Sequence, residues 1–272
     1  MLAIKNNLMS TNAARHLGQS YNALSKSVER LSSGLRINGA KDDAAGLAVR
    51  ELMRADVAVT QQGVRNAQDG ISMLQTMEGA LAQVDDILVR MQALAEQAST
   101  GSYSTAQRTI MQNEFDELRQ EIDRIATSTK FNGISMLDNT TTVSVQFGKL
   151  TTDKIDIAGS NVTSASSGLN LTGLTIGNAT SAKAALTTLD TAIGTKDTAR
   201  AKLGYKMNRL EGTVNVMNIQ AENLMTAESR VSDVDVAEEM ASMTRNQVLA
   251  QAGIAMLSQA NSMPQMALQL LQ

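Results

Sequence analysis

A sustained apolar spacing of three and four residues constrains the fold of this chain more than any other feature. Such spacing places the side chains on one face of a long α-helix and indicates coiled-coil-like packing against partner helices. The stripe, which contains one phase slip, consists of Val64, Ala67, Ile71, Leu74, Met77, Leu81, Val84, Leu88, Met91 and Ala95. The chain is therefore expected to be mainly helical.

The same spacing predicts further helices on both sides of this stripe. The first carries Leu17, Tyr21, Leu24, Val28 and Leu31. Another follows the interruption TGSYST at 100–105 and carries Met111, Phe115, Leu118, Ile122 and Ile125. The most regular stripe belongs to a helix that begins near Ala182 and consists of Leu203, Met207, Leu210, Val214, Met217, Ala221 and Leu224. A last amphipathic stretch runs to Leu271, and Pro264 alone breaks it.

Two segments lack helical spacing. Residues 141–157 alternate apolar and polar side chains, which predicts a β-hairpin. Residues 158–181 are rich in Gly, Ser, Thr and Asn and predict a surface loop or an irregular β segment. Aromatic residues make up only 2% of the chain and Met occurs 16 times, so the helices are expected to pack through small and flexible side chains. The predicted fold is a long antiparallel, coiled-coil-like helical bundle with a small β-hairpin.

Two short joints interrupt the helices. The stretch ERLSSGLRINGAKDDAAGLAV at 29–49 holds a helix stop, a turn and an acidic pair that can cap the next helix, at Gly34, Asn38–Gly39 and Asp42–Asp43. Ser229–Asp235 form a second, acidic joint. The simplest packing joins the two terminal helices and, separately, the three inner helices, so that the joints lie side by side. Two stacked domains follow, with residues 1–43 and 232–272 in one and residues 44–231 in the other.

The terminal helices are expected to be unstable by themselves. A helix pair buries one seam, in which each larger apolar side chain contributes on the order of 1.5–3 kcal/mol. Ordering the backbone costs about 1–2 kcal/mol per residue, and backbone hydrogen bonds offset only part of that cost. We expect these helices to become ordered when neighbouring copies of the chain cover more of their apolar surface.

Composition argues against several classes of partner. A net charge of -3 and a pI near 5.3 give no reason to expect nucleic acid or an anionic membrane. The absence of cysteine excludes disulfides and cysteine metal sites. No run approaches the roughly 18 consecutive apolar residues of a membrane span. The first residues have no ordinary secretory signal, so a cytoplasmic location is expected unless another export route applies.

No residue pattern points to catalysis, a cofactor or a metal site. The single histidine, His16, lies beside Arg15 on a predicted helix and has no nearby ligand partner. Acidic residues at Asp85–Asp86 and along the third helix are expected to form solvated faces with ion pairs one helical turn apart. The third-helix group consists of Glu114, Asp116, Glu117, Glu121 and Asp123, which lie among Arg119 and Arg124.

Several long motifs resemble the bacterial flagellins, in the order found in that family. They are SVERLSSGLRINGAKDDAAGLAV (27–49), NAQDGISMLQTMEGALAQVDDIL (66–88), FNGISML (131–137), AESRVSDVDVAEEMA (227–241) and AQAGIAMLSQAN (250–261). The resemblance covers nearly everything except about residues 140–180. It implies an extracellular structural subunit that polymerises with copies of itself into the flagellar filament and serves motility.

The resemblance also implies a route and an arrangement. Flagellins leave the cell unfolded through the growing flagellum by a type III apparatus, without a cleaved signal peptide, and polymerise beneath a distal cap. The cap, the junction proteins, an export chaperone and the export apparatus are therefore expected partners. The terminal helices would form an inner tube, the inner helices an outer tube, and residues 29–49 the spoke between them. Larger members insert outer domains near 160–180, so this chain is expected to form a thin, smooth filament.

One stretch, LVRMQALAEQA at 88–98, resembles the segment sensed by the Toll-like receptor for flagellin. The matching positions are Arg90 and Leu94, with Glu114 on the next helix. The alternative role of these residues is packing between subunits stacked along the filament. The stretch departs from the common pattern at Gln92, Ala93 and Glu96.

Covalent modification is a further expectation from the resemblance, because bacterial flagellins are often modified on Ser or Thr. The candidates are Thr163, Ser164, Ser166, Ser167 and Thr172. The same region carries N-x-[ST] sequons, which arise easily by chance in an Asn- and Thr-rich segment. No H-E-x-x-H metallopeptidase motif is present, because the chain has a single histidine.

Two alternatives to a filament subunit are open. The hook–filament junction protein shares flagellin-like ends, although the well-formed spoke and inner unit argue against it. A secreted adhesin or immune ligand would need exposed aromatic anchors, and the 158–181 loop has none. An enzyme is the least expected class.

Overall fold

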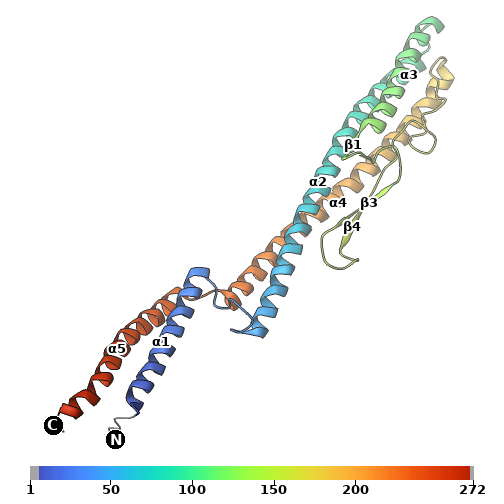
Figure 1. Cartoon of the computed structure of the whole chain (residues 1–272). Helices are drawn as coiled ribbons and strands as arrows, with labels where there is room; N and C mark the ends of the chain where they lie inside the picture. Colours follow the sequence, from blue (N-terminus) through green and yellow to red (C-terminus); the bar gives the residue numbers. More distant parts are fainter. Residues whose placement is uncertain (1–5, 270–272) are drawn as a thin grey trace. The chain divides into compact units, whose positions relative to one another are not determined.

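The computed structural model describes residues 6–269, apart from the side chains of 264, 265 and 267–269. Five helices and four short strands follow one another as α1 (Leu8–Ser33), α2 (Ala44–Ser99), α3 (Thr105–Ser128), β1 (Lys130–Phe131), β2 (Ile134–Ser135), β3 (Thr142–Gln146), β4 (Lys154–Ala158), α4 (Ala179–Ser232) and α5 (Val236–Gln269). The predicted fold class, mainly helical with a small antiparallel hairpin, is confirmed (Figure 1).

The chain divides into two compact units. The terminal-helix unit comprises Met1–Val57 and Glu222–Gln272, and the central unit comprises Ala58–Ala221. These boundaries lie beyond the joints, whereas the sequence suggested boundaries at the joints themselves. The difference arises because the first turns of α2 pack with the first joint, as the buried Arg50 side chain shows by donating a hydrogen bond to the Ile37 carbonyl.

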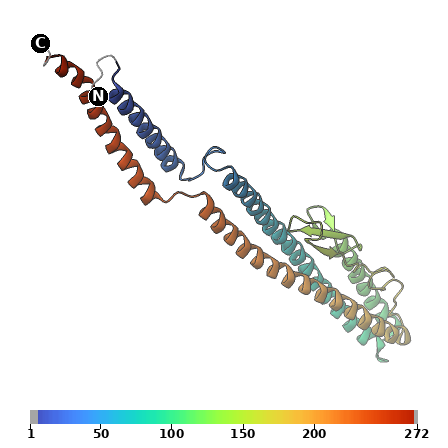
Figure 2. The ribbon, with the colours of Figure 1, turned by 90° about the horizontal axis from the view of Figure 1, so that it is seen from below.

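The central unit is a bundle of α2, α3 and α4 around one apolar core. Figures 1 and 2 show the three helices running side by side over much of their length. The predicted stripe of α2 supplies most of its buried side chains, and α3 contributes Phe115 and Ile122. The stripe of α4 is buried at Leu203, Leu210, Met217 and Ala221. The apolar periodicity therefore identified the inward faces of all three helices.

The β3–β4 hairpin lies against α2 at two glycines one heptad apart. The Asn66 side-chain amide donates to the Gln146 carbonyl over 2.8 Å. A Cβ built on Gly63 would lie 2.0 Å from the Phe147 carbonyl oxygen, and one on Gly70 would lie 3.0 Å from Val145. Because a side chain at Gly63 would collide with backbone, glycine is required there for the hairpin to dock.

A second, smaller hairpin was not expected from the sequence. The two-residue strands β1 and β2 pair antiparallel around Asn132–Gly133, both of which have positive φ angles of 49° and 79°. This is the backbone pattern of a two-residue hairpin turn, for which Asn-Gly is a favoured sequence. The flanking strands are too short to produce an alternating pattern, so the dipeptide was the only available signal.

The segment between β4 and α4 has no regular secondary structure, but it is not merely a surface loop. Val162, Leu169, Leu171 and Ile176 are buried in the central core. The Asp123 carboxylate of α3 accepts hydrogen bonds from both the amide and the hydroxyl of Ser164, each over 2.7 Å. The prediction of a surface location is wrong for these side chains, because isolated apolar residues in a polar segment show no period that would indicate burial.

Candidate functional site: the joint and the terminal helices

Gly34 ends α1 in the left-handed conformation expected of it. Its φ is 72°, and its N–H donates to the Arg30 carbonyl over 2.8 Å. An L-residue at this φ would be strained even though no atom lies within 4 Å of a built Cβ. The direction in which the chain leaves α1 therefore depends on glycine at this position.

The two joints pair with each other. Leu35 and Asp233 form an antiparallel bridge, with the Arg36 N–H donating to the Ser232 carbonyl over 2.6 Å and the Val234 N–H donating to the Gly34 carbonyl over 3.1 Å. The expectation that the joints lie side by side is confirmed. The second joint is shorter than predicted, since α4 continues through Ser232 and leaves only residues 233–235 outside the helices.

The acidic pair has two separate roles. Asp43 caps α2, because its carboxylate accepts the Gly46 N–H over 2.8 Å. Asp42 instead contacts Lys26 of α1 at 2.7 Å and accepts the Asn38 N–H at 3.3 Å. The hydrogen bond from Lys26, with that from Asn38, holds the pKa of the Asp42 carboxyl below its ordinary value. Asp42 therefore ties the joint to the preceding helix.

The turn at Asn38–Gly39 is held by short-range hydrogen bonds. The Gly39 carbonyl accepts the Asp42 N–H over 3.0 Å, and the Asn38 side chain donates to the Glu29 carbonyl over 3.4 Å. Asn38, Gly39 and Asp42 thus form one hydrogen-bonded turn, whereas Gly34 and Asp43 cap the helices on either side of it.

Ile37 and Arg50 belong to the joint but were not singled out from the sequence. Ile37 is 2% exposed, and Arg50 donates to its carbonyl over 2.8 Å. Gly46 makes room for Ile37, because a Cβ there would lie 2.7 Å from the Ile37 side chain. The only available signal was Ile37 itself, an apolar residue between Arg36 and the Asn38 turn.

The terminal helices α1 and α5 form an antiparallel pair in both ribbon views (Figures 1 and 2). At one end Asn7 donates to the Ala260 carbonyl over 2.7 Å, and at the other Arg30 contacts Glu239 at 3.3 Å. Between them, a Cβ on Gly253 would lie 3.1 Å from the Leu17 side chain. The predicted pairing of the two chain ends is confirmed for the described residues.

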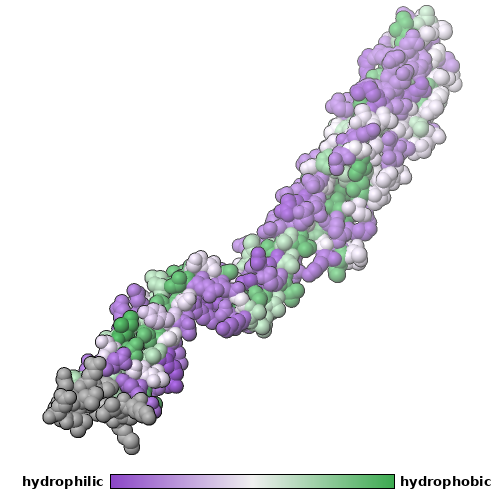
Figure 3. Space-filling view, in the orientation of Figure 1, coloured by the Kyte–Doolittle hydropathy of each residue, from purple (hydrophilic) through white to green (hydrophobic). Residues whose placement is uncertain are grey.

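The helix pair leaves most of its apolar surface uncovered. Among the described residues of α1 and α5, the buried apolar side chains are only Ala250 and Ala260. The large apolar side chains that remain exposed on these helices are Leu8, Met9, Tyr21, Val28, Val236, Met240, Val248, Leu249, Ile254, Met256 and Met266. Figure 3 shows some of this surface as green areas on the terminal helices. An exposed apolar surface of this kind marks an interaction site.

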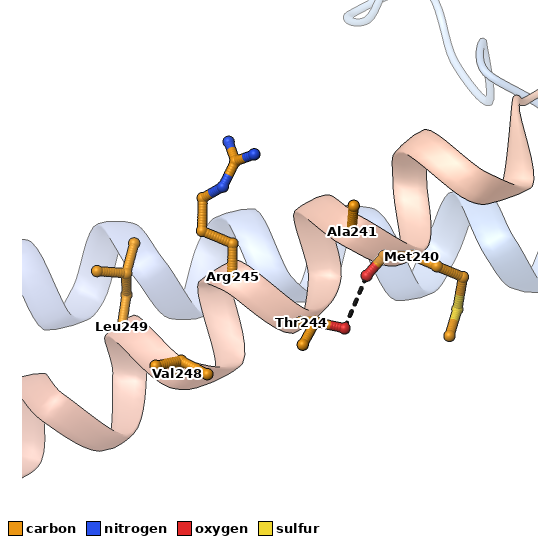
Figure 4. A pocket seen from close by; sticks show the side chains of 6 residues that line it. All are labelled: Met240, Ala241, Thr244, Arg245, Val248 and Leu249. Carbon is orange, nitrogen blue, oxygen red and sulfur yellow. Dashed lines mark hydrogen bonds between the residues drawn. The ribbon is translucent and has the colours of Figure 1, made fainter.

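An apolar groove on α5 concentrates part of this surface (Figure 4). It is lined by Met240, Ala241, Thr244, Arg245, Val248 and Leu249. The Thr244 hydroxyl donates to the Met240 carbonyl over 2.8 Å, so its polar group is satisfied within the helix. In Figure 4 the Arg245 side chain points away from Met240 and Val248. The groove therefore offers a mainly apolar contact surface on one helix face.

The residues expected to face a receptor are not equally accessible. Arg90 and Glu114 form an ion pair between α2 and α3 at 2.6 Å, and both side chains are exposed. Leu94 is 3% exposed and belongs to the central core. In this fold Leu94 supports the helix packing and is not available as a direct contact.

The modification candidates also differ in access. Ser166, Ser167 and Thr172 are exposed, and Thr163 is half-buried with its hydroxyl donating to Asn161 over 2.7 Å. Ser164 is 7% exposed and its hydroxyl is held by Asp123. Burial makes Ser164 a poor acceptor.

Two of the predicted charged residues form ion pairs within α3, since Arg119 pairs with Asp116 and Arg124 with Glu121, each three residues apart. Glu114 and Asp85 pair with other helices instead, through Arg90 and Lys196. His16 lies exposed on α1. Within residues 6–269, no group of three or more His, Cys, Asp or Glu side chains is placed to hold a metal ion. None of the described helices combines the length and apolar character needed to cross a lipid bilayer.

Comparison with known proteins assigns the family. The N-terminal helical region of bacterial flagellin matches residues 4–142, and the C-terminal helical region matches residues 186–271. A flagellin of Halalkalibacterium halodurans is 43% identical over 99% of this chain and its own whole length, and one of Bacillus subtilis is 38% identical over the same shares. The crystal structure of Bacillus cereus flagellin is 33% identical with a TM-score of 0.52, covering 60% of this chain and 94% of that one. This chain belongs to the bacterial flagellin family.

Proposed function

We propose that the terminal-helix unit is the principal contact surface through which copies of this chain assemble. As a flagellin, the chain is a structural subunit that polymerises into the extracellular filament of the bacterial flagellum. Its family is structural, and we assign it no catalytic reaction.

The observation that supports it is the mismatch between buried and exposed apolar side chains on α1 and α5. The pair buries two alanines of α5 and exposes large side chains on both helices, such as Leu8 of α1 and Val248 of α5. Covering such side chains stabilises an assembly by about 25 cal/mol for each Å² removed from water. Neighbouring copies, present at every repeat of a filament, are the partners best suited to provide this cover.

The paired joints are proposed to act as the spoke that fixes the repeating contact geometry. Copies joined by a contact that does not close into a ring continue as a helix. A small change in the exit direction at Gly34 would then recur in every subunit. The Leu35–Asp233 bridge supports this role, since it links the joint between α1 and α2 to the joint between α4 and α5.

The remaining partners are inferred from the family. They are the distal cap, the junction proteins, an export chaperone and the type III export apparatus, through which the chain would leave without a cleaved signal peptide. Recognition by a host Toll-like receptor is a further prediction. Of its proposed contacts, Arg90 and Glu114 are the accessible ones.

Deletion of residues 236–272 tests the assembly proposal. The truncated chain is expected to stay monomeric in sedimentation and to form no filaments in electron micrographs, because α1 loses its partner helix. Its circular dichroism should still show a cooperative helical transition from the central unit. Normal filaments from the truncated chain would refute the proposal.

A further inference from the structure

Methionines divide between the two units according to their exposure. Apart from Met1, which lies outside the described residues, every exposed methionine belongs to the terminal-helix unit and every buried one to the central unit. The exposed methionines are Met9, Met225, Met240, Met256 and Met266. The buried methionines are Met73, Met77, Met91, Met136 and Met217. The half-buried ones occur in both units.

The exposed methionines are also the main sulfur groups that an oxidant can reach. The chain contains no cysteine and no tryptophan. A peroxide that meets an unassembled subunit therefore finds thioethers as its chief reactive side chains. The exposed fraction is 62% for Met256 and 44% for Met240. A buried thioether can react with peroxide only after the core opens locally.

We propose that the exposed methionines form an oxidation site that controls assembly. This inference rests on the proposed role of the terminal-helix unit as the contact surface. The thioether sulfur attacks one oxygen of hydrogen peroxide, the O–O bond breaks, and the products are a sulfoxide and one water molecule. The sulfur loses two electrons and the peroxide gains them, so no further reactant is needed.

Oxidation of Met240 makes part of the proposed contact surface polar. Met240 lines the apolar groove of α5 beside Ala241 and Val248. A sulfoxide oxygen is a strong hydrogen-bond acceptor, and its burial against apolar side chains without a donor is unfavourable. Oxidised subunits are therefore excluded from the filament, while subunits already assembled are protected because the neighbouring copies cover their terminal helices.

The first measurement locates the oxidation. Unassembled full-length chain is treated with hydrogen peroxide, and each methionine peptide is followed by mass spectrometry for the gain of one oxygen atom. The exposed methionines are expected to react first and the buried methionines last. Equal rates in the two units would overturn the proposal, and this readout does not require the chain to polymerise.

The second measurement follows assembly. After peroxide treatment the critical concentration for seeded polymerisation is expected to rise at least about tenfold. Methionine sulfoxide reductases, added with a thiol reductant, should restore it. Treated subunits that are oxidised at the exposed methionines and still polymerise normally would overturn the proposal.

Matched variants separate the site from general damage. Replacing the five exposed methionines by leucine keeps apolar volume and removes the sulfur that peroxide oxidises. The critical concentration of this variant is measured before and after peroxide treatment, and the ratio of the two values should stay near one. Replacing Met73, Met77 and Met91 by leucine should leave the chain as sensitive as the parent. Equal sensitivity of the first variant and the parent would overturn the proposal. Failure of the untreated parent to polymerise would instead refute the proposed function, and the peptide measurement would still decide where oxidation occurs.

Discussion

Lys196 of α4 forms ion pairs with Asp85 of α2 and with Asp197, although its own side chain is only 2% exposed. It lies on the buried face of α4 between Ala192 and Ala199, which are themselves buried and small. Small side chains interlock weakly and resist sliding of one helix along another poorly. A single charged side chain at a core position can specify helix register. The Lys196–Asp85 pair is therefore expected to fix the register of α4 against α2.

Removing the Lys196 side chain should destabilise the central unit. Lys196→Ala leaves Asp85 with only its longer contact to Arg200 at 4.0 Å and opens a cavity, so the free energy of unfolding should fall by about 1–3 kcal/mol in urea. Lys196→Met, which keeps the volume, should cost less than Lys196→Ala. Lys183→Ala, at an exposed site on the same helix, should change stability by less than about 0.5 kcal/mol. Equal effects of Lys196→Ala and Lys183→Ala would contradict the register role.

The carboxyl of Asp42 should titrate below its ordinary range. The hydrogen bond from Lys26 holds its pKa down, so its contribution to stability is complete above the unfolded pKa and is lost as the pH falls through the lower, folded value. NMR titration of the side chain measures this directly. Lys26→Met should return the pKa toward the ordinary value, and an unchanged titration in that variant would show that Lys26 is not the cause.

Substitution of Gly34 should disturb assembly more than substitution of Gly39. Gly34→Ala or Gly34→Val forces a side chain into the left-handed region, which costs at least about 1 kcal/mol and redirects the chain. Gly39→Ala is the matched control, because its φ is not positive and no atom lies within 4 Å of the built Cβ. Micrographs should show altered or missing filaments for the Gly34 variants alone.

Proline at Asn38 should also disturb the joint. Asn38→Pro removes the N–H that donates to Asp42 and restricts the preceding residue. Filaments of changed shape, or none, are expected in micrographs. Filaments indistinguishable from those of the parent would argue against the proposed role of the joint.

Two glycines of α2 should respond in opposite directions to alanine. Gly63→Ala places a Cβ 2.0 Å from the Phe147 carbonyl oxygen, so the hairpin must move and the melting temperature should fall. Gly79→Ala meets nothing within 4 Å and should raise helix stability by up to about 1 kcal/mol. Thermal unfolding followed by circular dichroism distinguishes them. A loss of stability in both variants would indicate that the hairpin contact is not the cause.

Sequence alone predicted the features of this fold that follow a repeating spacing of residues. The stripes on α2, α3 and α4 mark the buried faces because a helix returns the same face every three or four residues. Gly34 and Asp43 were predictable because helix ends require particular backbone and capping chemistry. The pairing of the joints followed from the order of the helices along the chain.

Contacts between residues that lie far apart in the sequence were not predictable in the same way. The burial of Val162 and Ile176 depends on Asp123 and Gln112 holding an irregular segment against α3. The need for glycine at position 63 depends on where the Phe147 carbonyl lies. The contact of Arg50 with Ile37 likewise crosses the joint and shows no period. Leu94 was predicted to contact a receptor from its sequence motif alone. Its position on the inward face of α2 was not taken into account.

The bond from the Arg36 side chain to the Val231 carbonyl spans 195 positions of the chain. A polypeptide that emerges from the ribosome amino end first must wait for nearly all of its length before this bond can close. Until then α1 lacks its partner helix α5, and its apolar side chains can contact other proteins bound to the nascent chain. The terminal-helix unit therefore cannot close before the carboxyl-terminal part of the chain has been made.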